Sequence, residues 1–234
     1  TDLVITVDCG ISALDEIDYA NQKGLEIIVT DHHECGEVLP NAIAVVNPKR
    51  PNTKYPFAQL AGVGVAFKLI QAIAIKLGLP QESYLKYIDI VCIGTIADIV
   101  PLIDENRIIA KNGLEMFRNT QNIGMKALLK RCGFTRIDSG VISFGLSPRI
   151  NACGRIRDPQ KALDLFLTED EKEAEILAAE LDEANLERQN IERKIFEHAK
   201  EVIENSDMKN DPIIVLGDDN WHHGVIGIVA SKLV

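Results

Sequence analysis

The chain has 234 residues, of which 46% are hydrophobic and 26% are charged, and its formal net charge is −10. This length and composition are typical of a soluble globular protein with one large or two smaller domains. They exclude a membrane-spanning protein, since Asp89 and Asp98 interrupt the most hydrophobic stretch, residues 87–103. Five scattered cysteines without a Cys-x-x-Cys pair predict free thiols in a reducing cytoplasm.

The negative charge argues against a nucleic-acid partner only if it is spread evenly over the surface. It is concentrated instead, because residues 169–204 hold 13 acidic and five basic residues. Acidity therefore belongs mostly to one segment, and the net charge does not exclude a basic groove elsewhere.

Three β-rich runs within the first 50 residues predict buried strands, and they read DLVITVD, LEIIVTD and NAIAVVNP. Between the first two runs, Ser12 is expected to cap a helix that continues to Lys23 and stops at Gly24. A strand, a helix and a second strand at this spacing predict a βαβ unit with a parallel sheet. The predicted fold class is therefore α/β.

The remainder of the chain reads as mainly helical. Residues 61–131 show apolar residues at helical spacing, whereas residues 138–157 are expected to be irregular and rich in Gly, Ser and Arg. An amphipathic stripe over residues 169–205 predicts one helix about 55 Å long, which suits a connector between two domains. After it, PIIVLGD predicts a strand, and WHHGVIGIVASKL predicts a glycine-rich turn that leads into a helix.

These patterns predict three parts along the chain. They are a parallel-sheet domain with a helical portion over residues 1–168, the connecting helix over residues 169–205, and the start of a second α/β domain over residues 206–234. The sequence begins inside a strand without a methionine and stops within a helical pattern. Both ends are therefore expected to be cut, which would make the chain a fragment of a longer protein.

Acidic and imidazole side chains follow two of the predicted strands. Asp8 follows the first strand, and Asp31, His32 and His33 follow the second. Ligands of a parallel sheet bind beyond the carboxyl ends of its strands, so these side chains should share one edge. Asp98 lies among apolar residues in GTIADIVPL, where an unpaired carboxylate is costly to bury, so it should cap a helix or bind a cation. A lone Asp at a strand end is usually a turn or cap residue, but the combination favours a metal site that activates water against a phosphoryl group.

Two further stretches are candidates for phosphate contacts. SPRINACGR offers Arg149, Asn151 and Arg155, and arginines suit bidentate phosphate binding, although a solvated or acid-paired loop is an equally good interpretation. In HHGVIGI, Gly224 and Gly227 could bring backbone amides at a helix start close to a phosphate. Close packing of that helix explains the two glycines equally well.

The Asp-His-His triplet, the upstream VDCG and the downstream GTIADIVPL resemble the motifs of the DHH phosphoesterase superfamily. SPRINACGR and WHHGVIGIVASKL narrow the resemblance to the RecJ single-stranded-DNA-specific exonucleases, whose DHH domain is joined by a long helix to a DHH-associated domain. The resemblance covers essentially the whole chain, and its motifs stand in the family's order. It implies a two-metal enzyme, dependent on Mn²⁺ or Mg²⁺, that degrades single-stranded DNA from the 5′ end in repair and recombination.

Carried over motif by motif, the resemblance implies a role for each candidate residue. Asp8 would bridge two metal ions, and His32 and Asp98 would complete the shell of the second ion. His33 would face the scissile phosphate, and Asp31 would be a ligand or would orient the histidines. The DNA would be held by residues of the later motifs, namely Arg149, Asn151, Arg155, His222 and Gly224.

The chain departs from the family pattern at both ends. The family's first metal motif, an aspartate-rich strand end, would precede Thr1, and most of the sheet of the DHH-associated domain would follow the last residue. These 234 residues alone are therefore expected to be inactive or weak in cleavage and doubtful in DNA binding. Ser147 and Cys153 stand where the family often has Gly and Ala, which are small changes.

Two alternative functions stay open. One is a DHH-family nanoRNase or a phosphatase for adenosine 3′,5′-bisphosphate, although its DHH-associated domain usually carries a more glycine-rich signature than HHGVIGI. The other is a non-catalytic RecJ-like replication scaffold, although such scaffolds tend to lose the metal ligands that are present here. As partners we expect single-stranded DNA and no membrane, with a single-strand-binding protein or a helicase as candidates, for a cytoplasmic monomer.

Overall fold

The computed structural model describes residues 1–134 and 136–233, and its contacts divide the chain into two compact units. The first comprises Thr1–Thr120 with Arg136–Ser143, and the second comprises Gln121–Thr135 with Phe144–Val234. None of the described helices combines the length and the apolar character that crossing a bilayer requires. The predicted division at residues 168 and 205 stays a prediction.

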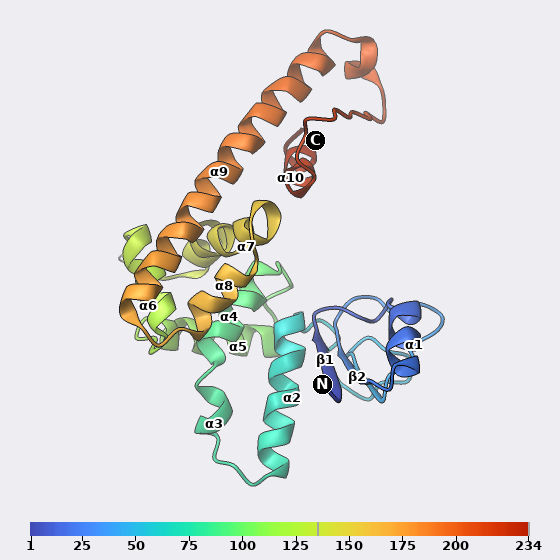
Figure 1. Ribbon diagram of the computed structural model, residues 1–234, viewed down its shortest axis with the longest axis vertical. Coiled ribbons are helices and arrows are strands. Elements are labelled where there is room, and N and C mark those ends of the chain that lie inside the picture. Colours follow the sequence, from blue (N-terminus) through green and yellow to red (C-terminus); the bar gives the residue numbers. More distant parts are fainter. Residues whose placement is uncertain (135, 234) are drawn as a thin grey trace. The chain divides into compact units, whose positions relative to one another are not determined.

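The first unit contains a three-stranded parallel sheet with the order β1-β2-β3. Its strands are β1 (Leu3–Val7), β2 (Glu26–Thr30) and β3 (Ala44–Val46). On α1 (Leu14–Gln22), Ile17 joins Ile27 and Val29 of β2 in a buried apolar cluster. Figure 1 shows α1 and α2 (Gly62–Lys76) on opposite sides of the sheet. The predicted βαβ unit and the α/β fold class are therefore confirmed.

The start of α1 differs from the prediction, whereas its end agrees with it. The N-cap residue is Ala13 and no side chain caps the helix, so the prediction for Ser12 is wrong. The reason is a turn before the helix, in which the amide of Ala13 donates to the carbonyl of Gly10. Gly24 follows the helix with a φ of 76°, a left-handed conformation that favours glycine and ends the helix as expected.

Three more helices complete the described part of the first unit before Thr120. They are α3 (Glu82–Leu85), α4 (Ile88–Ala97) and α5 (Asp104–Phe117). α4 is apolar along most of its length and packs against both α2 and α5, which explains why Val91, Cys92 and Ile96 are buried. These helices confirm the predicted helical region and fix the end of α4, where Asp98 is the C-cap residue.

A small hydrogen-bonded cluster ties α2 to α5. The ammonium group of Lys68 lies 2.9 Å from Oε1 of Glu105, and the Tyr55 hydroxyl donates to Oε2 of the same carboxylate. Burial raises the pKa of Glu105, but the hydrogen bonds from Tyr55 and Lys68 and the charge of Lys68 outweigh it, so the pKa lies below its usual value. The Glu105 side chain is still 34% exposed, so water weakens the interaction.

Replacing Glu105 with Gln is therefore expected to lower the free energy of unfolding by about 1 kcal/mol at pH 7. A carboxylate with a lowered folded-state pKa stabilises the protein above its unfolded pKa of about 4.3, and this contribution disappears as the pH falls through the folded-state pKa. The difference between wild type and Glu105→Gln should therefore shrink toward pH 3. Urea unfolding at both pH values checks this, with Glu115→Gln on the exposed side of α5 as the control; an unchanged difference at pH 3 would contradict it.

The second unit is organised around α9 (Glu171–Glu204), which Figure 1 shows as one long helix. Asp170 caps it by accepting hydrogen bonds from the amides of Lys172 and Glu173. The helices that pack on α9 are α6 (Ile123–Cys132), α7 (Ser147–Ile156), α8 (Gln160–Leu167) and α10 (His223–Leu233). The predicted long helix is confirmed, and its apolar stripe is buried by these four helices.

The expectation of an irregular stretch at residues 138–157 is wrong. A π-helix, η1 (Val141–Leu146), leads directly into α7, and Pro148 occupies the first turn of that helix. Proline is well suited to this position because the first amides of a helix have no partner within it. Ala152 and Cys153 form the buried side of α7, a short apolar stripe that the surrounding polar residues obscure in the sequence.

The predicted strand at residues 212–218 is also wrong. This segment has no strand partner among the described residues, and it follows a short 3₁₀ helix, η2 (Asp207–Asn210). Ile213 and Val215 are 77% and 81% exposed. The β-branched composition is that of a strand, but a strand also requires a neighbouring backbone with which to exchange hydrogen bonds.

Candidate metal centre

The carboxyl ends of the three strands are in register, and one polar residue follows each of them. Val7 pairs with Thr30, and Thr30 pairs with Val46, so the residues that follow, Asp8, Asp31 and Asn47, lie at the same edge of the sheet. The amide of Asp8 donates to Thr30 and the amide of Asp31 donates to Val46, which extends the pairing by one residue. The predicted placement of Asp8 and Asp31 is therefore confirmed.

Asp31 is only 1% exposed, and hydrogen bonds surround its carboxylate. Oδ2 accepts from the amide of Ile11, and Oδ1 accepts from the amides of His32 and His33. The Nδ1 atom of His33 lies 2.7 Å from the same Oδ1. Burial raises the pKa of Asp31, but these hydrogen bonds outweigh it and hold the pKa below its usual value. Asp31 is therefore ionised, and its carboxylate orders the backbone at Ile11, His32 and His33 through their amides.

His32 brings two carboxylates together at one imidazole nitrogen. Its Nε2 lies 3.1 Å from Oδ1 of Asp8 and 3.5 Å from Oδ2 of Asp98. The His32 residue is 8% exposed, and Nε2 is buried without a hydrogen-bond partner. A buried nitrogen with no partner, faced by two carboxylate oxygens, is a donor set that suits a divalent cation. The residues present therefore fit a metal ion.

The side chain of His33 is more open, with 60% of its surface exposed. One ligand atom each from Asp8, His32 and His33 lie within 4.8 Å of one another, and the two imidazole centroids are 4.5 Å apart. The two adjacent imidazoles therefore lie at the same site. The chain leaves the strand at Asp31, and the two amide hydrogen bonds to that carboxylate turn both rings toward the same site.

Asp98 reaches the centre from the end of α4. Burial and the charge of Asp8 raise the pKa of Asp98, whereas the neighbouring His32 lowers it, and burial dominates. Asp98 is thus the C-cap residue of α4, in agreement with the first predicted possibility, and its carboxylate faces the candidate site, while cation binding stays a prediction.

Gly62, the first residue of α2, is packed directly against Asp8. A Cβ atom built on Gly62 would lie 2.1 Å from Oδ1 and 2.7 Å from Cβ of Asp8, which no pair of real atoms can tolerate. Asp8 itself has a φ of 63°, a conformation that Asp adopts more readily than most residues. The absence of a side chain at position 62 therefore allows the Asp8 carboxylate to occupy its place at the centre.

Replacing Gly62 with Ala is accordingly expected to displace the Asp8 carboxylate and to weaken divalent-metal binding by about tenfold or more. Gly64→Ala, two residues along the same helix, is the matched control, because its Cβ would meet only the side chain of Leu60, at 3.3 Å or more, and not Asp8. The Mn²⁺ concentration that half-saturates the rise in thermal midpoint measures the effect. Equal Mn²⁺ affinity in both variants would contradict this role for Gly62.

The sequence did not single out Asn47, which follows β3 at the same edge. Asn47 is 3% exposed; its Nδ2 donates to the carbonyl of His33 at 3.0 Å, and its Oδ1 accepts from the amide of Lys49. Asn47 thus holds the carbonyl of His33, while Asp31 holds its amide. The rule that identified Asp8 and Asp31, a polar residue directly after a strand, applies equally to Asn47.

The remaining candidates lie in the second unit, on α7 and at the start of α10. Arg149 donates to Asp182 at 2.8 Å and to the carbonyl of Gly145, so the acid-paired interpretation holds for this residue. Asn151 is exposed on α7. Arg155 is exposed and donates to the carbonyl of Gly224, and a Cβ on Gly224 would lie 2.2 Å from the Arg155 carbonyl oxygen. The structure thus brings Arg155 and Gly224 together through close packing of α10 on α7.

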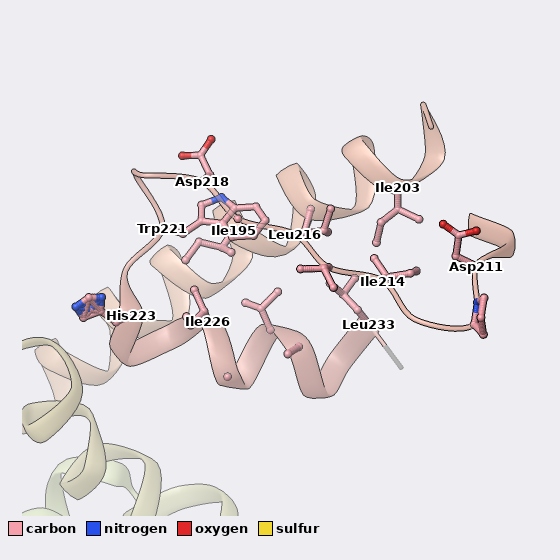
Figure 2. A pocket seen from close by; sticks show the side chains of 17 residues that line it. Ile195, Ile203, Asp211, Ile214, Leu216, Asp218, Trp221, His223, Ile226 and Leu233 are labelled. Atoms are coloured by element: carbon pink, nitrogen blue, oxygen red, sulfur yellow. The ribbon is translucent and has the colours of Figure 1, made fainter. Parts of the chain in front are cut away.

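His222 precedes α10 with an exposed side chain, and its Nδ1 accepts from the amide of Gly224. Nearby, a pocket of about 840 Å³ lies between α9, residues 211–218 and α10. Figure 2 shows that apolar side chains such as Ile195, Ile214 and Trp221 dominate its lining. All of its lining residues belong to the second unit, and it lacks the clustered ligands that distinguish the sheet edge.

Comparisons with known proteins agree with this geometry. Residues 1–95 match the model of the DHH family, N-terminal domain. The chain is 48% identical over 234 residues to the single-stranded-DNA-specific exonuclease RecJ of Bacillus subtilis (strain 168), and 35% identical over 246 residues to that of Escherichia coli (strain K12). Both matches cover 99% of this chain, but only 29% and 43% of those relatives, so the chain spans less than half of their length.

Solved structures are also similar to the whole chain. The crystal structure of RecJ from Thermus thermophilus in complex with Mn²⁺ matches the whole chain with a TM-score of 0.88 and 38% identity, over 34% of its own length. A second crystal structure, of exonuclease RecJ bound to manganese, matches the whole chain with a TM-score of 0.86 and 39% identity, over 58% of its length. Residues 1–95 therefore match the DHH family, N-terminal domain, and the chain is similar to RecJ proteins in sequence and fold over its whole length.

Proposed function

We propose that this chain carries the metal centre of an exonuclease that hydrolyses phosphodiester bonds of single-stranded DNA from the 5′ end. The observation that carries the proposal is the convergence of Asp8 and Asp98 on the buried, unpartnered Nε2 of His32. Relatives named as single-stranded-DNA-specific exonucleases, and similar structures that contain Mn²⁺, support it. Because the chain spans only part of those relatives, the activity is a property to be tested on the full-length protein.

In this proposal Asp8, His32 and Asp98 hold Mn²⁺ or Mg²⁺, which are cations that accept carboxylate oxygens and imidazole nitrogens. When bound, the metal ions polarise the phosphodiester and lower the pKa of a coordinated water. The chain contributes the prearranged ligands: Gly62 leaves room for Asp8, and the C-cap position of α4 presents Asp98. His33 lies close enough to this group to serve as a further ligand or to contact the substrate.

We propose that His33 contacts the scissile phosphate and that Asp31 orients the imidazole ring of His33. Ionised Asp31 can only accept hydrogen bonds, so Nδ1 of His33 carries the proton that faces it. A hydrogen bond from Nε2 to a phosphate oxygen then requires a proton on Nε2 as well, that is, the imidazolium form of His33. The carbonyl of the same residue is held by Asn47. Two fixed points, one on the ring and one on the backbone, hold His33 in a single orientation although its side chain is mostly exposed.

The DNA strand is proposed to contact five residues of the second unit, namely Arg149, Asn151, Arg155, His222 and Gly224. Arg155 and Asn151 offer exposed polar groups, and the single hydrogen bond from Arg155 to Gly224 leaves other guanidinium donors available. The guanidinium of Arg149 is already paired with Asp182, so it would have to break this pair or bind Asp182 and a phosphate at once. Its contribution to DNA binding should therefore be smaller. A single-strand-binding protein or helicase as partner, a monomeric state and a cytoplasmic location stay predictions.

An assay of the full-length protein with Mn²⁺ on end-labelled single- and double-stranded DNA tests the function. We expect stepwise loss of nucleotides from the 5′ end of the single strand and little attack on the duplex. Hydrolysis of dinucleotides or adenosine 3′,5′-bisphosphate without degradation of long strands would instead identify the nanoRNase or phosphatase alternative. Binding of Mn²⁺ without any hydrolysis would favour the scaffold alternative.

A further inference from the structure

Ile99, the residue directly after Asp98, has an unusual backbone conformation. Its φ is 58°, in the left-handed region where β-branched residues are genuine outliers. It occupies the position after the C-cap of α4, where helices commonly place glycine. The Ile99 amide donates to the carbonyl of Ile96, so the turn needs the backbone at this position but not the isoleucine side chain.

The side chain of Ile99 also gains nothing from burial. It is 89% exposed, although a buried isoleucine would stabilise the protein. Two further large apolar residues of the same short segment, Leu102 and Ile103, are 38% and 50% exposed. The end of α4 therefore explains the left-handed backbone at Ile99 but not the choice of an exposed isoleucine for it, and strained residues of this kind concentrate at functional sites.

The segment that carries Ile99 is held firmly in place. Asn106, which is fully buried, donates from Nδ2 to the carbonyl of Pro101 at 3.1 Å and also to the carbonyl of Gln59. Asp98, at the start of the segment, is tied to the end of α4 by the hydrogen bond from its amide to Gly94. The backbone that carries Ile99 is therefore held at both ends, directly after the residue whose carboxylate faces His32.

We propose that Ile99 contacts the nucleobase next to the scissile phosphate of the DNA strand. This inference rests on the proposed function, since it concerns the substrate of the same site. A phosphodiester at the Asp8, His32 and Asp98 group places its flanking nucleotide beside the residue adjoining Asp98. The apolar surface of Ile99 suits the face of a base, whereas the sugar-phosphate backbone calls for polar and cationic groups. Ile99 thus adds a substrate-binding role within GTIADIVPL to that of its neighbour Asp98, the candidate metal ligand of the same motif.

The test compares Ile99→Gly and Ile99→Asn with wild type in the full-length protein. Glycine and asparagine tolerate the left-handed conformation, so the thermal midpoint should stay equal or rise in both variants. On a 5′-phosphorylated oligothymidylate with Mn²⁺, kcat/KM should fall by about tenfold because an apolar contact is lost. On a matched strand whose two 5′-terminal nucleotides are abasic, wild type and variants should differ by less than about twofold on the same reasoning. Mn²⁺ affinity should be unchanged.

Ile75→Ala is the matched control, because Ile75 is 67% exposed and lies near the opposite end of α2 from Gly62. It should leave cleavage of both strands unchanged. Equal kcat/KM for wild type and Ile99→Gly on the normal strand would overturn the base contact while leaving the proposed function intact, and would favour a protein partner on this surface. Equal losses on both strands would overturn it too, because Ile99 would then act through Asp98. Wild type that binds Mn²⁺ but cuts neither strand would overturn the proposed function and the contact together.

Discussion

Replacing Asp8 with Asn in the full-length protein is expected to abolish high-affinity Mn²⁺ binding and to lower single-strand cleavage by about 10³-fold or more. Asn preserves the shape of Asp8 and its fit against Gly62, but it removes the negative charge that lies 3.1 Å from His32. A metal ion would then meet one carboxylate of the pair instead of two. The loss should therefore arise from metal affinity and not from misfolding.

Two measurements separate these causes. Isothermal titration with Mn²⁺ reports the affinity, and the thermal midpoint without metal reports the fold, which should change little. Asp18→Asn on the exposed side of α1 removes the same charge from the same unit without touching the centre, so it should leave both binding and cleavage as in wild type. Cleavage near the wild-type rate in Asp8→Asn would remove Asp8 from the metal centre.

His33→Asn is expected to lower kcat by about 10²-fold while Mn²⁺ affinity stays within a few-fold of wild type. The amide nitrogen of Asn stands close to the place of Nδ1 and can keep the hydrogen bond to Asp31, but nothing replaces Nε2. His33→Gln has the opposite effect on the two contacts. Its amide nitrogen reaches the place of Nε2, but it loses the hydrogen bond to Asp31. Partial recovery of kcat in His33→Gln relative to His33→Asn would identify Nε2 as the atom that faces the phosphate.

The same pair of variants also tests the alternative that His33 is a metal ligand. A ligand contributes to affinity, so both variants would then weaken Mn²⁺ binding by roughly the same factor as Asp8→Asn does. Single-turnover kinetics at saturating Mn²⁺ distinguish the two roles, since excess metal rescues a lost ligand but does not replace a lost phosphate contact. Rescue of His33→Asn by excess Mn²⁺ would contradict the assignment of His33 to the phosphate.

Sequence patterns predicted the sheet edge well because its rules are local. A run of β-branched residues indicates a strand, and the residue after the strand lies at the ligand-binding edge of a parallel sheet. These two rules together located Asp8 and Asp31. Asp98 was found from the cost of burying a carboxylate among apolar residues, and it faces the same site. The long helix around α9 was equally accessible, because its apolar stripe repeats over many turns.

What the sequence could not supply depends on tertiary contacts. The convergence of His32 and His33 comes from two amide hydrogen bonds to Asp31, which no periodicity reveals. α7 was missed because Gly, Ser and Pro suggested a loop, although its buried side needs only Ala152 and Cys153. The strand predicted at residues 212–218 is absent for the opposite reason: its composition suits a strand, but the described residues provide no neighbouring strand with which it could pair. The role of Gly62 required the position of Asp8, 54 residues earlier in the chain.

The hydrogen bonding of Asp31 also bears on how distant relatives should be diagnosed. Its two carboxylate oxygens accept from three backbone amides and one imidazole, and an asparagine there would turn a donor toward donors. The first letter of the Asp-His-His triplet is therefore required by the backbone around it, whether or not a reaction takes place. A descendant that had lost hydrolysis would still be under selection to keep this aspartate. Retention of Asp31 therefore indicates an intact local fold, whereas under the proposed function Asp8, His32, His33 and Asp98 are the positions that would distinguish a hydrolase from a scaffold.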